Sequence, residues 1–97
     1  MSETIDDLTI AFSEDGVETT KELGKHILSK GAWSTIIFRY QDWDKAKQHY
    51  GPVKYSIRRY QKRNNQYWQK SKFNISSDDQ ARKIIDVLSG WLEDQPS

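Results

Sequence analysis

Hydrophobic and polar residues alternate through the middle of the chain, and the pattern changes to a helical spacing towards its end. Residues 32–43 (AWSTIIFRYQDW) and 53–63 (VKYSIRRYQKR) are rich in the β-branched and aromatic residues that fit a pleated sheet. The polar pair Asn64 and Asn65 is typical of a hairpin turn, and residues 67–75 (YWQKSKFNI) follow it. We therefore predict three strands here, of which the last two form an antiparallel hairpin.

The first part of the chain has a weaker pattern. Residues 1–7 (MSETIDD) are predicted to be a flexible acidic tail, and residues 8–13 (LTIAFS) a short strand that ends at the Glu-Asp-Gly turn of residues 14–16. Residues 17–30 fit a strand only in part, since some of their apolar positions also fit one face of a helix. We interpret them as a strand, because the Lys-Gly pair that ends them is typical of a turn. Residues 44–52 are predicted to be a polar loop.

A helix is predicted over residues 78–93. Ser77 and Gln80 have the spacing of a capping box, and Asp78 and Asp79 lie in the first turn, where the helix dipole favours anions. The apolar residues that follow recur at helical spacing and form one stripe, namely Ala81, Ile84, Ile85, Leu88, Trp91 and Leu92. Strands followed by one terminal helix favour an α+β fold, in which the helix packs on one face of an antiparallel sheet. Residues 8–97 are predicted to form a single domain.

The two faces of the sheet can be sorted by parity, because successive side chains of a strand point to opposite sides. A two-residue turn at Asn64 and Asn65 would place Ile57 opposite Lys72. A three-residue loop places Ile57 opposite Phe73, and we predict this loop because register follows the buried face. The opposite, basic face then gathers five cations and two rings, namely Lys54, Arg58, Tyr60, Lys62, Trp68, Lys70 and Lys72.

The same sorting of residues 32–43 places Ile36 and Phe38 towards the core. Trp33, Arg39 and Trp43 then point the other way, and we count them with the basic face.

Charge is distributed unevenly, although the net charge of the 97 residues is only +1. Residues 1–22 hold seven acidic side chains and one basic side chain, whereas residues 23–72 hold twelve Lys or Arg and two Asp. Residues 73–97 are acidic again, with five acidic and two basic side chains. A basic middle between acidic ends steers oppositely charged partners, unless it is a chance cluster on a solvated face.

Cations neutralise phosphates and exposed rings stack on bases, so the basic face favours a single-stranded nucleic acid, DNA or RNA, as the partner. The structural alternative is that Tyr60 and Trp68 form a cross-strand aromatic pair that only stabilises the sheet. The functional alternative is a protein-interaction module that docks an acidic partner on the basic sheet.

Other classes of function have little support in the sequence. Asp42, Asp44 and His49 are close together but lack a recognised metal-ligand spacing, and the scattered glycines form no phosphate-binding loop. We therefore predict no enzyme activity, no metal and no cofactor. The chain has no cysteine, no apolar run of about 20 residues and no signal-peptide pattern at its start, which predicts a cytoplasmic protein.

Residues 54–92, KYSIRRYQKRNNQYWQKSKFNISSDDQARKIIDVLSGWL, resemble the positive-cofactor-four family of transcriptional coactivators and its bacterial relatives. The resemblance lies in the YSIRRY strand, the polar turn, the basic returning strand, KFNIS and the long terminal helix. It implies a curved sheet of about four antiparallel strands, homodimers formed through the helices, and single-stranded DNA bound across the sheet. The long segment 44–52 and the ambiguous segment 17–30 depart from the family's pattern.

Residue by residue, the resemblance assigns Lys54, Arg58, Lys70 and Lys72 to the DNA backbone and Tyr60 and Trp68 to bases. It assigns Ile84, Leu88 and Trp91 to the core or the dimer interface. The apolar stripe of the helix adds Val87 to that predicted interface, because the stripe extends beyond what one small sheet can cover.

Overall fold

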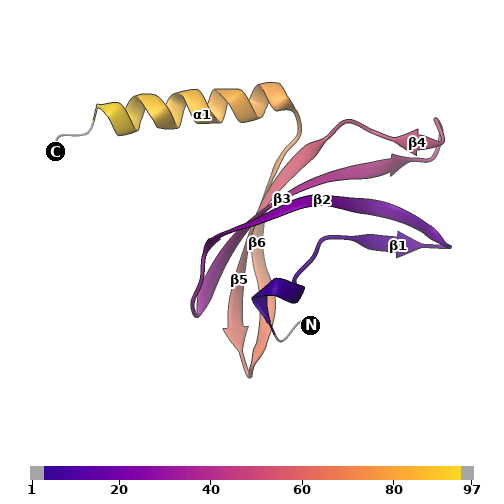
Figure 1. Cartoon of the computed structure of the whole chain (residues 1–97), viewed down its shortest axis with the longest axis horizontal. Helices are drawn as coiled ribbons and strands as arrows, with labels where there is room; N and C mark the ends of the chain where they lie inside the picture. The colour runs from indigo at the N-terminus through magenta and orange to yellow at the C-terminus, as the bar shows by residue number, and fades with distance from the viewer. Residues whose placement is uncertain (1–3, 95–97) are drawn as a thin grey trace.

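The computed structural model describes residues 4–94 and has an α+β fold, as the sequence predicts. A curled antiparallel sheet is followed by one C-terminal helix (Figure 1). The strand order is β1-β2-β3-β5-β6, and β4 pairs with the end of β3. The elements are η1 (Ile5–Asp7), β1 (Phe12–Glu14), β2 (Val17–Ser29), β3 (Trp33–Asp44), β4 (His49–Tyr50), β5 (Lys54–Arg63), β6 (Gln66–Ile75) and α1 (Asp78–Glu93).

The ambiguous segment is a strand, β2, and it pairs with β3 along most of its length. The segment predicted as a polar loop contains the two-residue strand β4. Part of the predicted acidic tail is ordered as η1, while residues 1–3 of that tail lie outside the described residues. The first strand begins later than predicted, because Leu8 and Ile10 do not join the sheet and pack on it instead.

The hydrophobic core lies on one face of the sheet, here named the core face. Ile36 and Phe38 of β3 are fully buried there, as predicted. Leu8 and Ile10 cover them from the N-terminal segment, together with the partly buried Ile5. The remaining buried members of this cluster are Tyr40, Tyr60 and Tyr67. The other face of the sheet, here named the open face, is covered among residues 4–94 only where the start of α1 lies against it, beside the buried Ile75.

Lys25 of β2 fastens the N-terminal segment to the core face. Its ammonium group donates to the backbone carbonyls of Ile5, Asp6 and Leu8 at 2.9, 2.9 and 2.7 Å. The Ile5 carbonyl also accepts from the Leu8 backbone amide at 3.3 Å, and the lysine cation supplies further donors to carbonyl groups at the end of this short helix. The lysine charge is therefore used within the fold.

The hairpin between β5 and β6 turns through two residues, so the predicted three-residue loop is wrong. Arg63 pairs with Gln66, while Asn64 and Asn65 have φ angles of 53° and 62°. Two consecutive left-handed residues make the turn whose twist matches that of the strands, and asparagine adopts this conformation more readily than most residues.

A β-bulge in β6 then corrects the register. The pairing shifts between Arg59–Ser71 and Tyr60–Gln69, which leaves Lys70 as the extra residue. Beyond the bulge, Ile57 pairs with Phe73 as predicted. Because one extra residue exchanges the two faces, residues on the turn side of the bulge have the opposite orientation to the one that parity alone predicts.

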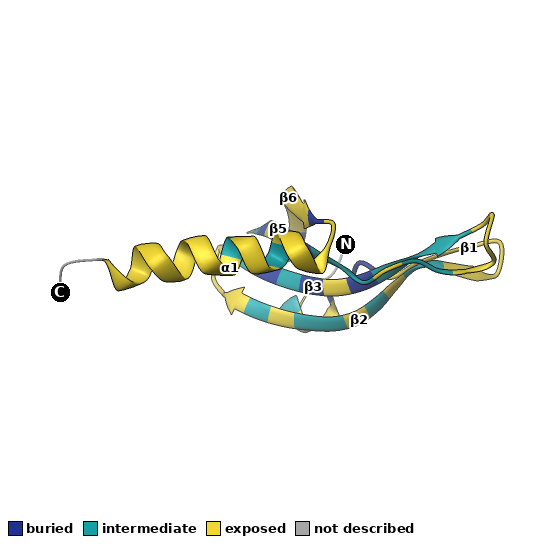
Figure 2. Ribbon diagram, turned by 90° about the horizontal axis from the view of Figure 1, so that it is seen from above, coloured by how far each residue is buried: buried dark blue, intermediate teal, exposed yellow. Residues whose placement is uncertain are grey.

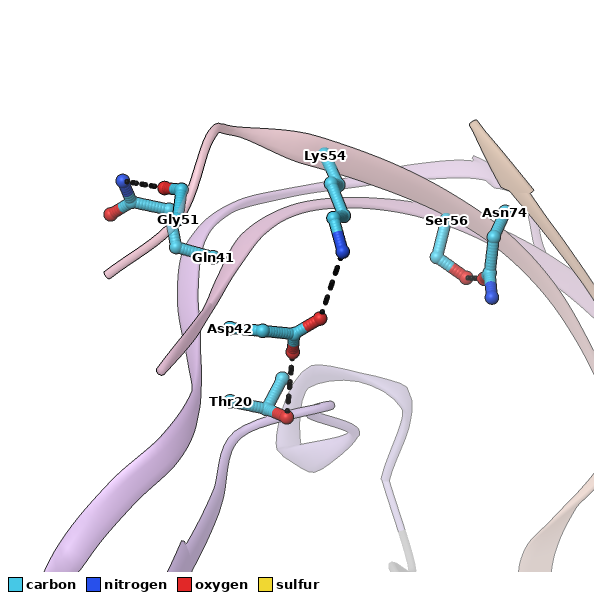
Figure 3. A network of polar contacts seen from close by, with 7 residues as sticks. All are labelled: Thr20, Gln41, Asp42, Gly51, Lys54, Ser56 and Asn74. Atoms are coloured by element: carbon cyan, nitrogen blue, oxygen red, sulfur yellow. Dashed lines mark hydrogen bonds and ion pairs between the residues drawn. The ribbon is translucent and has the colours of Figure 1, made fainter. Parts of the chain in front are cut away.

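The predicted assignment of the two faces is also wrong, because the pairing of β3 with β5 places Arg58, and not Ile57, beside Ile36. Ile36 lies opposite Arg58, and Phe38 lies opposite Ser56. The core face is therefore the face of Lys54, Arg58 and Tyr60, which was predicted to be the solvent-exposed basic face. Ser56 is buried there and donates to the Asn74 side chain at 2.7 Å, which satisfies its hydroxyl group (Figure 3).

The helix begins as predicted. The Ser77 hydroxyl accepts from the backbone N–H of Gln80 at 3.1 Å, and the side-chain oxygen of Gln80 accepts from the backbone N–H of Ser76 at 3.0 Å. Tyr55 donates to the Asp78 carboxylate at 2.8 Å, which ties the first turn to the open face. This hydrogen bond is the largest cause of the raised pKa of Tyr55.

The predicted packing of the helix on one face of the sheet holds only for the first turns of α1. After its first turns, α1 extends away from the strands, and none of its residues is buried (Figure 2). Its length and hydropathy are too small for a membrane-spanning helix.

Candidate nucleic-acid interface

The open face has two halves of different chemistry. Near α1 it is largely apolar, with Ile37, Tyr55, Ile57 and Phe73 in adjacent strands, although the exposed Arg39 lies opposite Tyr55. Phe73 is 53% exposed. Towards the β5–β6 turn it carries rings and cations. We name this second half the hairpin-end cluster, and its members are Trp33, Arg59, Gln61, Arg63, Trp68 and Lys70.

Two exposed indoles dominate the hairpin-end cluster. Gln61 of the central strand β5 pairs with Trp33 of β3 on one side and with Trp68 of β6 on the other. Residues directly opposite one another in a sheet point to the same face, so both indoles flank the Gln61 side chain. Each tryptophan is 42% exposed, which leaves ring surface available for stacking.

Cations surround the two rings. The Arg59 guanidinium lies 4.7 Å from the centroid of the Trp33 ring, a cation–π distance. Arg63, Asn64, Trp68 and Lys70 line a hollow of about 290 Å³ beside the turn. Within residues 4–94 the salt bridges are Lys54–Asp42 and Lys83–Asp79, so no carboxylate neutralises this cluster.

Two cations predicted for the site, Lys54 and Arg58, form contacts on the core face instead. Lys54 lies 3.3 Å from Asp42, which also accepts from Thr20 at 3.2 Å (Figure 3). Arg58 donates to the Ser56 hydroxyl at 3.2 Å and to the Gln69 side chain at 3.1 Å. The Lys54–Asp42 and Arg58–Gln69 contacts join neighbouring strands, and they reduce what the two side chains can offer to a phosphate.

Tyr60 cannot stack on a base in this structure, because it is 5% exposed and packs in the core. Burial raises the pKa of its hydroxyl, and the nearby Arg58 opposes that shift. Lys62 lies 5.6 Å from the centroid of the Tyr67 ring at the margin of the same core. Lys72 is exposed and lies opposite Arg58, also on the core face.

Arg39 and Trp43 lie too far along β3 to join the hairpin-end cluster. Strands rise about 3.3 Å per residue, so Arg39 is roughly 20 Å and Trp43 roughly 33 Å from Trp33. Arg39 lies opposite Tyr55 near the helix. Trp43 packs edge-on against Tyr50 with ring centroids 5.0 Å apart, and Lys21 lies over the Tyr50 ring.

The structure thus brings together three of the predicted nucleic-acid residues, Trp33, Trp68 and Lys70. It adds Arg59, Gln61 and Arg63, which were not among the predicted nucleic-acid residues. The signal that would have found them is the Asn-Asn pair, because a two-residue turn pairs Gln61 with Trp68 directly.

The acidic residues near β4 form no metal site. Asp44 pairs with His49 across the β3–β4 ladder and accepts from the Lys47 amide at 3.1 Å. Asp42 instead accepts a hydrogen bond from the Thr20 hydroxyl and forms a salt bridge with Lys54. Among the described residues, no group of three or more His, Cys, Asp or Glu side chains could hold a metal ion.

The predicted dimer-interface residues lie on the exposed apolar stripe of α1. Ile84 and Leu88 face a groove of about 520 Å³ between the helix and the apolar half of the open face. Val87 and Trp91 continue the stripe beyond the sheet, and Trp91 is 66% exposed.

Comparisons with known proteins identify no relative of this chain, because no family model, no curated protein and no solved structure matches it. The resemblance to the positive-cofactor-four family therefore stays a prediction.

Proposed function

We propose that this protein binds single-stranded nucleic acid, DNA or RNA, with low sequence specificity, and that the hairpin-end cluster is its binding surface. The observation that carries this proposal is the pair of half-exposed indoles, Trp33 and Trp68, on one face among three cations that have no carboxylate partner within residues 4–94.

The chemistry of the cluster suits a single strand. Each phosphate neutralised by a cation such as Arg63 or Lys70 releases counterions, and each base stacked on an indole contributes roughly 1–3 kcal/mol. Bases of a single strand are free to stack, whereas those of a duplex are paired with one another. A duplex would more naturally require a recognition helix, and the first turn of α1 is acidic.

A second proposal concerns the oligomer. We infer that two copies of the chain associate through α1, because its stripe and the adjoining groove share Ile84 and Leu88 and are lined mostly by apolar residues. Contiguous apolar patches of this kind mark interaction sites, and a two-fold interface covers the same patch on both copies. The occupant of the groove is therefore the helix of a second copy.

The proposed function is tested by fluorescence anisotropy. The protein is titrated into labelled oligo-dT of about twenty nucleotides, and into the matching duplex, at two salt concentrations. We expect tight, salt-sensitive binding to the single strand and weaker binding to the duplex. Weak binding to both would reject nucleic-acid binding. It would favour the alternative function, in which the basic surface docks an acidic protein. In that case an acidic peptide would bind to the protein, and an oligonucleotide would fail to displace it.

A further inference from the structure

The position of Gln61 between the two indoles carries a further inference about the hairpin-end cluster. Trp33 and Trp68 stand on the two strands that flank β5, so their backbones are separated by two inter-strand distances, roughly 10 Å. Stacked atoms lie about 3.5–4.0 Å apart. A separation of this size is larger than one stacking distance, so a base stacked on either indole lies within reach of the Gln61 side chain.

The Gln61 amide is free to bind a ligand. The described residues provide no hydrogen bond to its side chain, although Gln69, in the same hairpin, is bonded by Arg58 on the core face. Gln61 is only half-buried, and its neighbours across both ladders are the two tryptophans. A carboxamide presents an acceptor and a donor side by side, which is the pattern that pairs with adenine in protein–nucleic acid complexes.

We propose that Gln61 reads an adenine base held at the two indoles. Its carbonyl oxygen accepts from the exocyclic amino group of the base, and its amide N–H donates to the adjacent ring nitrogen. The hollow lined by Arg63, Asn64 and Lys70 lies beside Trp68 and receives the neighbouring phosphate. This inference rests on the proposed function and adds one preferred base to an otherwise sequence-tolerant surface.

The test uses oligo-dT of about six nucleotides whose central base is adenine, unsubstituted purine or thymine. Purine has the same rings as adenine but lacks the amino group, so it separates base reading from stacking. Tryptophan fluorescence of the full chain reports binding. We expect the adenine oligonucleotide to bind at least about fivefold more tightly than the purine one.

Gln61→Met keeps the length of the side chain but cannot form this hydrogen-bonded pair, and we expect it to bind adenine and purine equally. Gln69→Met is the matched control on the opposite face, and it should keep the preference. Thermal unfolding of both variants verifies that the fold is intact.

Equal binding of adenine and purine by the wild-type protein, or a preference that persists in Gln61→Met, would overturn the role of Gln61 and leave the proposed function standing. Failure of the wild-type protein to bind any of the three oligonucleotides would overturn the proposed function and this inference with it.

Discussion

Tyr60 and Trp68 lie on opposite faces of the sheet, although they belong to adjacent strands of one hairpin. Tyr60 is 5% exposed and packs among Ile36, Phe38 and the N-terminal segment, whereas Trp68 is 42% exposed beside Gln61. The two rings therefore have different roles. Tyr60 stabilises the fold, and Trp68 is available to a partner.

This separation predicts opposite effects for two substitutions. Trp68→Ala is expected to weaken oligo-dT binding about tenfold or more through the loss of stacking, with little change in stability. Tyr60→Ala is expected to lower the free energy of unfolding by about 3 kcal/mol, because it leaves a cavity in the core. Urea unfolding and anisotropy on both variants measure the two effects. A stable Tyr60→Ala protein that had lost binding would place the site on the core face instead.

Lys70 and Lys72 differ in sequence by two positions and lie on different faces. Lys70 lines the hollow with Arg63 and Trp68, and Lys72 lies opposite Arg58 on the core face. We expect Lys70→Ala to weaken binding and to reduce the slope of log K against log salt by about one. Lys72→Ala, its matched control, should leave that slope nearly unchanged. Equal slopes for both variants would contradict a site confined to the hairpin-end cluster.

The buried hydroxyl of Tyr60 predicts a dependence of stability on alkaline pH. Its pKa is raised by burial, so the unfolded chain loses this proton at lower pH than the folded chain does. The stabilising contribution is complete below the unfolded-state pKa of about 10 and is lost as pH rises through the folded-state pKa. Tyr60→Phe has no proton to lose.

The measurement is the free energy of unfolding of wild type and Tyr60→Phe at pH 8 and at about pH 11. The wild-type protein should lose more stability between the two pH values than the variant does. Parallel loss in both proteins would show that the Tyr60 hydroxyl does not contribute to the alkaline transition.

Dimerisation through α1 predicts a sharp contrast between neighbouring positions. Leu88 belongs to the apolar stripe and lines the groove, whereas Ser89 is exposed and lies off the stripe. A charge at position 88 would be buried unpaired in the interface, which costs several kcal/mol. Sedimentation at tens of micromolar protein should find wild type and Ser89→Asp dimeric and Leu88→Asp monomeric. A monomeric wild-type protein would refute the dimer directly.

Much of the secondary structure could be read from local patterns. The helix of residues 78–93 was predicted with its bounds, because the Ser77 cap and the apolar spacing are both local signals. The strands β3, β5 and β6 were predicted to within one residue at each end, because β-branched and aromatic residues concentrate there. Ile36 and Phe38 were predicted correctly as core residues.

The faces of the sheet were decided by tertiary pairing. Parity within one strand defines two sets of side chains, but it does not say which set of β5 lies beside Ile36 of β3. That choice depends on register across the sheet, where Ile36 meets Arg58. The extra residue Lys70 in β6 then reverses the orientation of Trp68 relative to Lys72, and a bulge of this kind leaves no periodic signal in the sequence.

The sequence by itself determined that this chain forms strands followed by one capped helix, and that its basic residues and rings concentrate in residues 54–72. Only the tertiary structure decided which of them remain accessible. The N-terminal segment brings Leu8 and Ile10 onto the face that carries Tyr60, since burying apolar surface there outweighs leaving the tyrosine exposed. The bulge at Lys70 moves Trp68 to the other face, beside Trp33 and Gln61, where both indoles are exposed to a ligand.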